Sequence, residues 1–510
     1  MKKIFLCLMV TMLVAATAVP AETVKSGGIL NYGIASKSIT VGVDPHVIQG
    51  DRTGWVLGQV CEGLLNYDQG LNPVPWLAKS WTITADGKTY TFELQQGVKF
   101  HNGREMEAND VKFSLERILD PNTGSRRRKN LEIIDAIETP EKYRVVIKLK
   151  SPFSPFLTYL VGVYAAIIPH ECVAQDGKVV NPMGTGPFTF VEWVKNDRLV
   201  VKKFKDYWIK GLPYLDEVIF KPLPDDAVRL TALRTGQVDI THSLPEKLLP
   251  KLMKDEDKNF VLSVKPGVPW RMLIMNTRKP PLNNVTLRQA IEAAIDREEI
   301  MMATTWGFGG VANQIWGKDS FWRMPGKVRK GADPEKAKTL LKKAGYPKGI
   351  DLTLEVKPAF LPFAEVVQDQ LKRVGIRCNL APMDWAALKP RMKKYEYHLA
   401  VSGAGWYSDP DARYGRFYSK DGPANYFAGG YTHPRIEDLL VQGRVETDAG
   451  KRKKIYTEIF QIANNEHPIV MLCMLPMTHA WLNKVENFKV SKQGDLALKD
   501  GGLSNVWLSE

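Results

Sequence analysis

Cysteine and histidine are both scarce in this sequence. Only five cysteines and eight histidines occur among 510 residues. No Cys-x-x-Cys spacing and no cluster of histidines is present, whereas a metal site requires several convergent ligands of this kind. We therefore expect no metal centre and no disulfide scaffold. One incidental disulfide and buried free thiols are both compatible with the four widely spaced cysteines, which are Cys61, Cys172, Cys378 and Cys473.

Catalytic motifs are missing as well. The sequence contains no Gly-x-Ser-x-Gly, no His-Glu-x-x-His, no phosphate-binding loop and no Gly-x-Gly-x-x-Gly. A glycine-rich stretch at residues 307–310 lacks the basic residue and the spacing that phosphate binding requires. These motifs supply the nucleophile, metal or phosphate site of many exported enzymes and cofactor-dependent proteins. Their absence disfavours an enzyme, and we expect no cofactor.

Long apolar runs are confined to the N-terminus. A short basic segment, Met1-Lys2-Lys3, precedes an almost uncharged run at residues 4–19 and small residues at 19–21. This is the pattern of a cleaved secretory signal, so we expect residues 1–21 to be removed and the mature chain to be periplasmic. The run is shorter than the ~20 residues of a membrane span. Because Cys7 lies inside the run and not after a cleavage site, we expect no lipid anchor.

The length and the charge indicate a multidomain globular protein. A chain of 510 residues exceeds what one hydrophobic core usually serves, so we expect two or three domains. The formal charge is +14, but the basic residues are scattered apart from a cluster at residues 126–129. We attribute the excess of positive charge to solubility and to the electrostatic steering of association, and we expect no nucleic-acid partner.

A turn-rich segment at residues 403–414 concentrates groups that bind ligands. Its sequence is Gly-Ala-Gly-Trp-Tyr-Ser-Asp-Pro-Asp-Ala-Arg-Tyr, and it follows an apolar, strand-like run at 398–401. Glycine and proline interrupt regular structure, so the side chains should project from a loop. A carboxylate beside an indole, such as Asp409 beside Trp406, can hold an ammonium group. Taken alone, the segment fits a tight turn with a solvated Asp-Pro-Asp and a core Trp better than a binding site.

Conserved-looking blocks along the chain resemble a known family. Residues 75–117 resemble the signature region of the family 5 extracellular solute-binding proteins, which are the peptide, oligopeptide and nickel receptors of ABC importers. Further blocks match the pattern of that family in the same order, at residues 181–188, 229–240, 275–297 and 333–346. In the first of these, we expect Gly184 and Gly186 to permit backbone angles that larger residues resist. In the second, Gly236 should follow a helix end.

The resemblance implies an α/β architecture, the two-lobed periplasmic-binding-protein fold of type II (cluster C) with an extra domain and a hinge between the lobes. It divides the chain into residues 22–57, 182–266 and 485–510 for the core domain of the first lobe, 58–181 for the extra domain, and 267–484 for the opposing lobe. The expected function is the capture of di- or oligopeptides and their delivery to the permease subunits of an ABC transporter. The protein would then be a monomeric receptor and not an enzyme.

The resemblance also implies a set of ligand-binding residues. In peptide-binding relatives, an Asp three residues after a Trp in this loop holds the α-ammonium group of the ligand, which corresponds to Trp406 and Asp409 here. The loop is shorter than in the common pattern, so an alternative alignment assigns the role to Asp411. Arg271 or Arg413 would meet the carboxylate of the peptide. The remaining candidates for the wall of the pocket are Trp270, Tyr407, Trp316 and Ser36.

Other ligands and other classes stay open on the sequence alone. The same receptor class includes proteins for nickel complexes, haem, opines and sugars. A bare metal ion is disfavoured because convergent histidines and carboxylates are lacking. An exported hydrolase would turn over a peptide or an ester. An exported chaperone would protect unfolded proteins and would have no defined small ligand.

Overall fold

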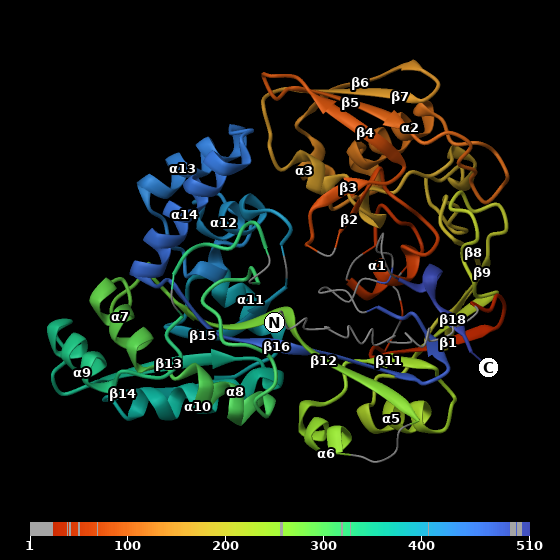
Figure 1. The fold of residues 1–510 in the computed structure, drawn as a ribbon. Coiled ribbons are helices and arrows are strands. Elements are labelled where there is room, and N and C mark those ends of the chain that lie inside the picture. The colour runs from red at the N-terminus through yellow and green to blue at the C-terminus, as the bar shows by residue number, and fades with distance from the viewer. Residues whose placement is uncertain are drawn as a thin grey trace, which may run out of the picture.

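A computed structural model describes residues 24–37, 39, 42–48, 51–68, 70–254, 259–317, 320–326, 328–405, 407–489, 496 and 502–509. The expected signal segment, residues 1–21, lies outside this range, and so does Trp406. Figure 1 shows two lobes side by side, connected by strands that run along their common base. Within the described part of the chain, no helix is both long and apolar enough to cross a membrane.

One sheet of ten strands extends through both lobes. Its order is β14-β13-β15-β12-β16-β11-β1-β10-β9-β8. The long strands β12 and β16 pair antiparallel from Phe260↔Leu482 to Ile274↔Ile469, with irregularities between Pro266 and Trp270 and between Arg271 and Met272. They connect the lobes in Figure 1. The strands are β1 (Ile29–Ile34), β8 (Phe188–Val194), β9 (Arg198–Lys203), β10 (Glu217–Pro222), β11 (Ile240–His242), β12 (Phe260–Met275), β13 (Ile350–Val356), β14 (Ile376–Pro382), β15 (Leu399–Ala404) and β16 (Ile469–Leu482).

The first lobe, which we define as β1 to β11 with α1 to α6, contains three separate cores, one of which lies around α5 and α6. One core packs β1, β9 and β10 against α1 and the C-terminal segment. The second fills the space between the sheet β4-β5-β7-β6 and α2. Alternate residues of β5 are buried, as expected for a sheet with one covered face. The bounds are β2 (Leu65–Tyr67), β3 (Pro73–Pro75), β4 (Ala78–Ile83), β5 (Thr89–Leu94), β6 (Ile134–Glu141), β7 (Arg144–Leu149), α1 (Asp51–Leu57), α2 (Ala108–Leu119), α3 (Arg128–Leu131), α4 (Phe156–Tyr159), α5 (Asp226–Arg234) and α6 (Leu249–Lys254).

The second lobe, which we define as β13 to β15 with α7 to α14, has helices on both faces of its sheet. Residues of β12 alternate between the two cores: Trp270 and Met272 belong to one, and Leu273 to the other. Figure 1 shows α8 and α10 below the sheet and α11 to α14 above it, and residues of α7 and α9 belong to the same core as those of α8 and α10. The bounds are α7 (Val285–Ala294), α8 (Arg297–Thr305), α9 (Pro334–Lys343), α10 (Leu361–Lys372), α11 (Trp385–Lys394), α12 (Pro410–Tyr418), α13 (Pro434–Val445) and α14 (Ala449–Glu466); the chain ends with the pair β17 (Val485–Glu486) and β18 (Trp507–Leu508).

The lobes also touch away from the connecting strands. The backbone N–H of Ser154 in the first lobe donates to the carbonyl of Arg444 at 2.8 Å. The Ser154 hydroxyl donates to the carbonyl of Glu446. These contacts join the segment before α4 to the connection between α13 and α14, so the structure holds the lobes against each other.

Two glycine predictions have different outcomes. Gly236 follows α5 with φ 74°, the left-handed conformation expected after a helix end. Gly184 and Gly186 do not have positive φ. The prediction that glycine is needed there for its backbone angles is therefore wrong. A Cβ atom at Gly184 would lie 2.3 Å from the carbonyl oxygen of Val60, and one at Gly186 would lie 2.5 Å from that of Gln59. The turn needs glycine because two backbone segments approach closely there.

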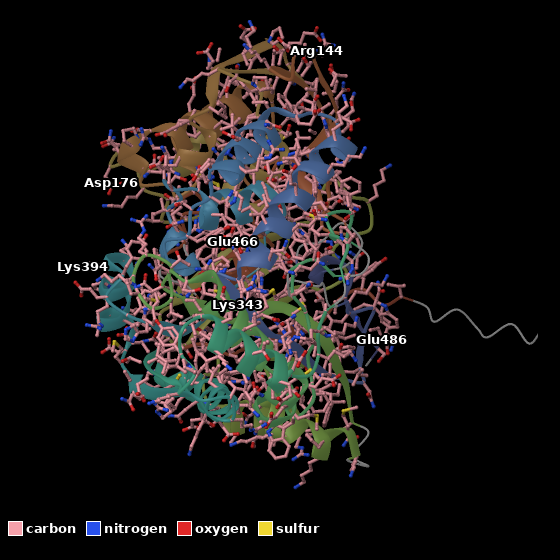
Figure 2. All side chains as sticks on the ribbon, turned by 90° about the vertical axis from the view of Figure 1, so that its left-hand side faces the viewer. Arg144, Asp176, Lys343, Lys394, Glu466 and Glu486 are labelled. Carbon is pink, nitrogen blue, oxygen red and sulfur yellow. The ribbon has the colours of Figure 1, made fainter. Side chains whose placement is uncertain are left out.

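Charge is distributed over the whole surface. In the view of Figure 2, acidic and basic side chains are interspersed from Arg144 and Asp176 at one end of the molecule to Lys343 and Lys394. Many of them form exposed ion pairs, for example Lys178 with Asp176 at 2.8 Å. Interspersed charges of both signs favour solubility.

Candidate functional site

The segment between β15 and α12 is shaped by a helix cap. Strand β15 ends at Ala404, and α12 begins at Pro410 with Asp409 as its N-cap. A carboxylate oxygen of Asp409 accepts the backbone N–H of Asp411 at 2.8 Å, and proline is well suited to the first helical position. The Asp-Pro-Asp sequence therefore starts a helix, and both carboxylates are directed into the second lobe.

Asp409 has a cationic partner inside the protein. Arg452 of α14 donates from Nη1 to Oδ2 at 2.5 Å and from Nη2 to Oδ1 at 2.7 Å. Both residues are buried. Burial alone would lower the pKa of Arg452, but the Asp409 carboxylate more than offsets this effect and the pKa is raised. A ligand ammonium group at Asp409 would have to share a carboxylate that Arg452 already neutralises, so this contact stays a prediction.

Asp411 is buried next to the same pair. Arg444 donates from Nε to its Oδ1 at 2.8 Å, and the Tyr456 hydroxyl lies 3.4 Å from the same oxygen. Burial raises the pKa of Asp411, and the nearby Arg444 guanidinium partly counteracts this effect. Asp411 therefore also has partners within the protein.

Trp270 and Arg271 lie on opposite faces of the sheet. Trp270 is fully buried on the side of α11 to α14, and its indole N–H donates to the Gly405 carbonyl at 3.1 Å. The Arg271 guanidinium lies 4.1 Å from the centre of the Phe360 ring, near α10. Burial lowers the pKa of Arg271. Adjacent residues of a strand point to opposite sides, so these two side chains do not form one wall.

Arg413, Tyr407 and Trp316 gather on the Trp270 side. The Arg413 guanidinium lies 4.9 Å from the Trp270 ring centre and 3.8 Å from that of Phe417. Tyr407 packs edge-on against Phe417, with ring centres 6.0 Å apart. Trp316 is buried beside Tyr414 at 5.6 Å.

Ser36 belongs to the other lobe, in the segment after β1. It is half-buried, and its backbone N–H donates to the Ile34 carbonyl at 2.8 Å. No described contact brings it to the second-lobe candidates. Trp406 lies among the residues that the structure does not describe.

A cavity of about 40 Å³ adjoins Arg413. It lies between the segment at residues 313–316, α12, α14 and the start of β16. Asn313, Arg297 and His467 line it and were not foreseen as site residues. Arg297 is paired with Glu292 at 3.0 Å, and burial lowers the pKa of His467 to about 4, which keeps its imidazole neutral at pH 7. Asn313 lies three residues before Trp316, but no pattern in the sequence marks it.

Of the two alternatives for the cysteines, a disulfide or free thiols, the structure shows free thiols. All four are buried free thiols, at Cys61, Cys172, Cys378 and Cys473. Burial raises the pKa of Cys378 and Cys473 to about 12. Across the described ranges, no group of three or more His, Cys, Asp or Glu side chains is placed to hold a metal ion.

Comparison with known proteins identifies the class. Residues 72–425 match the model of the bacterial extracellular solute-binding proteins, family 5. The chain belongs to this family, whose members are solute-binding receptors. The expected family and the two-lobed periplasmic-binding-protein fold of type II are thereby confirmed.

Relatives cover almost the whole chain. The glutathione-binding protein GsiB of Pectobacterium atrosepticum is 28% identical over 489 residues, which are 92% of this chain and 94% of the relative. The periplasmic binding protein DppA from Helicobacter pylori, in complex with peptide STSA, has a TM-score of 0.78 at 27% identity and covers 95% of this chain and 99% of its own. The binding protein AgaA from A. tumefaciens R10, in complex with agropinic acid, has a TM-score of 0.77 at 30% identity with the same coverage.

Proposed function

We propose that this protein is the periplasmic receptor of an ABC importer that captures di- or oligopeptides between its two lobes. The observation that carries the proposal is the lobe arrangement: β12 and β16 run between the lobes, while Ser154 contacts the α13–α14 connection on the far side. A few connecting strands allow rigid lobes to close around a ligand. Closure, and not catalysis, would create the shape that the permease subunits recognise.

Peptides are favoured by the relatives. GsiB is named for glutathione, itself a peptide, and DppA holds the peptide STSA. AgaA holds agropinic acid, which keeps a non-peptide ligand such as an opine as the second candidate. These ligands are those of the relatives, and we propose that a peptide is also the ligand of this chain.

The remaining features follow from the same receptor role. We place residues 1–21 as a cleaved signal peptide, with no lipid anchor, and the mature chain as a monomer that needs no cofactor. The proposed division is residues 22–57, 182–266 and 485–510 for the core domain, 58–181 for the extra domain, and 267–484 for the opposing lobe. The cores of the described residues support it: one joins β1 with the C-terminal segment, and another is confined to residues 64–167.

Calorimetry with defined peptides tests the proposal. The mature protein is titrated with glutathione, trialanine and a pentapeptide, and with free amino acids as controls. We expect at least one peptide to bind with a dissociation constant in the micromolar range or below. Binding of none of the peptides would contradict the proposal, and release of amino acids or shorter peptides from any of them would indicate an exported hydrolase.

A further inference from the structure

The end of β11 is directed toward the second lobe. This strand pairs parallel with β1 and antiparallel with β16, and β16 runs from the second lobe into the first. The chain of β11 therefore runs toward the second lobe, and Ser243 follows its last residue. In open α/β sheets, ligands bind outside the carboxyl ends of the parallel strands. Ser243 thus lies at the edge of the first lobe where a ligand is expected.

Strand β15 ends at the same boundary from the other side. It pairs antiparallel with β12, from Met275↔Leu399 to Trp270↔Ala404. Because β12 runs from the first lobe into the second, β15 runs back toward the first lobe. The segment at 405–409, in which the sequence predicted the ligand loop, follows the last residue of β15. This segment and Ser243 therefore face each other across the boundary between the lobes.

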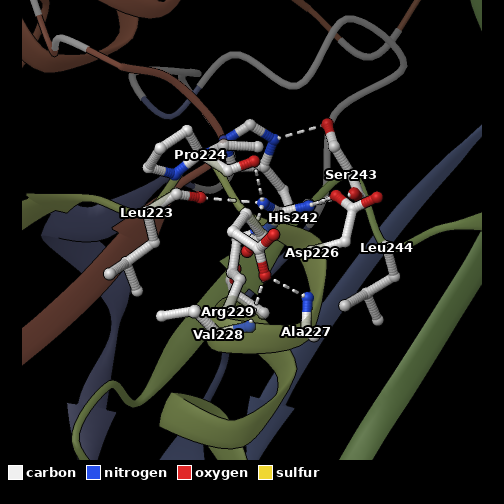
Figure 3. A network of polar contacts seen from close by, with 12 residues as sticks. Leu223, Pro224, Asp226, Ala227, Val228, Arg229, His242, Ser243 and Leu244 are labelled. Atoms are coloured by element: carbon white, nitrogen blue, oxygen red, sulfur yellow. Dashed lines mark hydrogen bonds and ion pairs between the residues drawn. The ribbon is translucent and has the colours of Figure 1, made fainter.

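Ser243 is held in a strained backbone conformation by buried neighbours. Its φ is 54°, in the left-handed region that residues other than glycine rarely adopt. Its N–H donates to the Thr478 carbonyl at 2.8 Å. Figure 3 shows two further contacts: Nη2 of Arg229 donates to its carbonyl at 2.6 Å, and its Oγ lies 2.9 Å from Nδ1 of His242. Residues that their surroundings hold in such a conformation are concentrated at functional sites.

Arg229 is a rigid anchor for this segment. Its side chain is fully buried, and all three of its guanidinium nitrogens are bonded in Figure 3. Nε donates to the His242 carbonyl at 3.1 Å, and Nη1 donates to the Leu223 carbonyl at 2.8 Å. Nη2 also donates to the Asp226 carboxylate at 2.6 Å. Rotation of Ser243 away from its position would leave part of this buried charge without a partner, which is costly.

His242 determines the direction of the hydrogen bond at the Ser243 hydroxyl. Burial lowers the pKa of His242 well below its ordinary value, so the ring is neutral at pH 7 and carries one hydrogen. The backbone N–H of Ala35 donates to Nε2 at 3.2 Å, so the hydrogen is on Nδ1 and is donated to Oγ of Ser243. The hydroxyl accepts from His242 and keeps its own hydrogen. In the described part of the chain, no acceptor receives that hydrogen.

The Ser243 side chain is suited to contact a ligand. The residue is exposed, its position is fixed from the buried side, and its O–H is a neutral donor. A donor of this kind matches a carbonyl oxygen. We propose that the Ser243 hydroxyl donates a hydrogen bond to a carbonyl oxygen of the ligand between the lobes, and that His242 acts as its positioning residue.

Two sources can supply the carbonyl oxygen. A peptide presents one at each of its backbone amides, and this source rests on the proposed function. A carboxylic acid that is not a peptide, such as the agropinic acid held by AgaA, presents a similar oxygen and does not depend on the proposed function. The chemistry of recognition is shared, so the source is a matter for experiment.

Calorimetry with Ser243→Ala tests the contact. The probes are the three peptides named above, which are glutathione, trialanine and the pentapeptide, together with agropinic acid. The variant should bind at least one probe about three- to tenfold more weakly than the wild type, as expected for the loss of one neutral hydrogen bond. Ser80→Ala removes an exposed hydroxyl from β4 in the same lobe and should leave every affinity unchanged.

A second variant guards against a loss of affinity through misfolding. Ser243→Gly removes the same hydroxyl, and glycine adopts a positive φ without strain. Its Tm without ligand should equal or exceed that of the wild type, while its affinity should fall as in Ser243→Ala. A variant of full stability and full affinity would overturn the contact.

The role of His242 has its own readouts. NMR of labelled histidine nitrogens should show the hydrogen of this ring on Nδ1, and a hydrogen on Nε2 would overturn the positioning role. His242→Phe should weaken binding of the probe in the wild type and have little further effect in Ser243→Ala, because both changes remove one coupled interaction. Independent, additive losses would contradict the role of His242 as a positioning residue.

The outcomes separate this contact from the proposed function. Weaker binding of a peptide by both Ser243 variants supports the contact and agrees with a peptide ligand. Weaker binding of agropinic acid, with no binding of any peptide, supports the contact and contradicts the peptide receptor. Peptide binding that both variants retain in full overturns the contact and leaves the proposed function intact. Binding of none of the four probes by the wild type overturns both.

Discussion

At the scale of single residues, the sequence motif Asp-Pro-Asp has a different environment from the one its composition predicts. Asp409 caps α12 and forms a two-point ion pair with Arg452, which lies 43 positions further along the chain. Arg413, four positions after Asp409, has no such partner among the described residues. The carboxylate thus contributes to the stability of the second lobe, while the Arg413 guanidinium packs against the rings of Phe417 and Trp270.

Asp409→Ala is therefore expected to destabilise the protein. The change strands the buried Arg452 charge and removes a helix cap, and loss of one partner of a buried pair costs about 3–5 kcal/mol. Urea unfolding followed by tryptophan fluorescence measures the loss. The double variant Asp409→Ala/Arg452→Met should recover part of it, because no charge is then stranded.

A matched control for Asp409 is available on the surface. Asp351 pairs with Arg377 at 2.6 Å, but both side chains are exposed, so Asp351→Ala should change stability little. Unaltered stability of Asp409→Ala, together with complete loss of ligand binding, would instead support the ammonium clamp that the sequence predicted.

At the scale of elements, the turn at residues 184–187 packs closely against the backbone of residues 59–61. The backbone N–H of Gly186 donates to the Val60 carbonyl at 3.0 Å. A Cβ atom at this position would lie 2.5 Å from the Gln59 carbonyl oxygen and 2.7 Å from the Val60 carbonyl carbon. The contact is between main-chain atoms, which cannot move aside as a flexible side chain can.

Gly186→Ala should consequently destabilise the protein. We expect a loss of about 1–3 kcal/mol, as for other overpacked sites, visible as a lower urea midpoint with an unchanged slope. Gly42 has open space around it and no positive φ, so Gly42→Ala is the control and should change the midpoint little. Equal midpoints for the two variants would show that the turn tolerates a side chain.

Sequence reasoning recovered the fold better than the site. Blocks such as Gly184-Thr185-Gly186 identify a family, and the family implies the arrangement of lobes. The site depends on contacts that local patterns do not encode: the pairing of Asp409 with Arg452 joins two helices, and Asn313 reaches its cavity from an irregular segment. The opposite directions of Trp270 and Arg271 could be predicted from the sequence alone, since neighbours on a strand face opposite sides.

At the scale of the whole molecule, buried histidines couple stability to pH. Burial lowers the pKa of His46, His101 and His467 to about 4. The unfolded chain binds protons near the ordinary value of about 6.5, so it takes up more protons than the folded protein between pH 6.5 and 4. The contribution of these groups is fully present above pH 6.5 and is lost as the pH falls toward 4.

The free energy of unfolding should therefore decrease as the pH is lowered from 7 to 5. Urea unfolding at several pH values measures the trend, and NMR of selectively labelled histidine rings measures the pKa values. Titration of the rings of His46, His101 and His467 near the ordinary value of about 6.5 would contradict the assignment of these three histidines as neutral.

We propose above that this member of family 5 carries peptides in the space between its lobes. Native mass spectrometry of the freshly purified mature protein, combined with analysis of the ligand released on denaturation, tests that claim most directly. We expect a set of short peptides. A single non-peptide mass, such as an opine or a metal complex, would contradict the peptide receptor and leave only the solute-binding class.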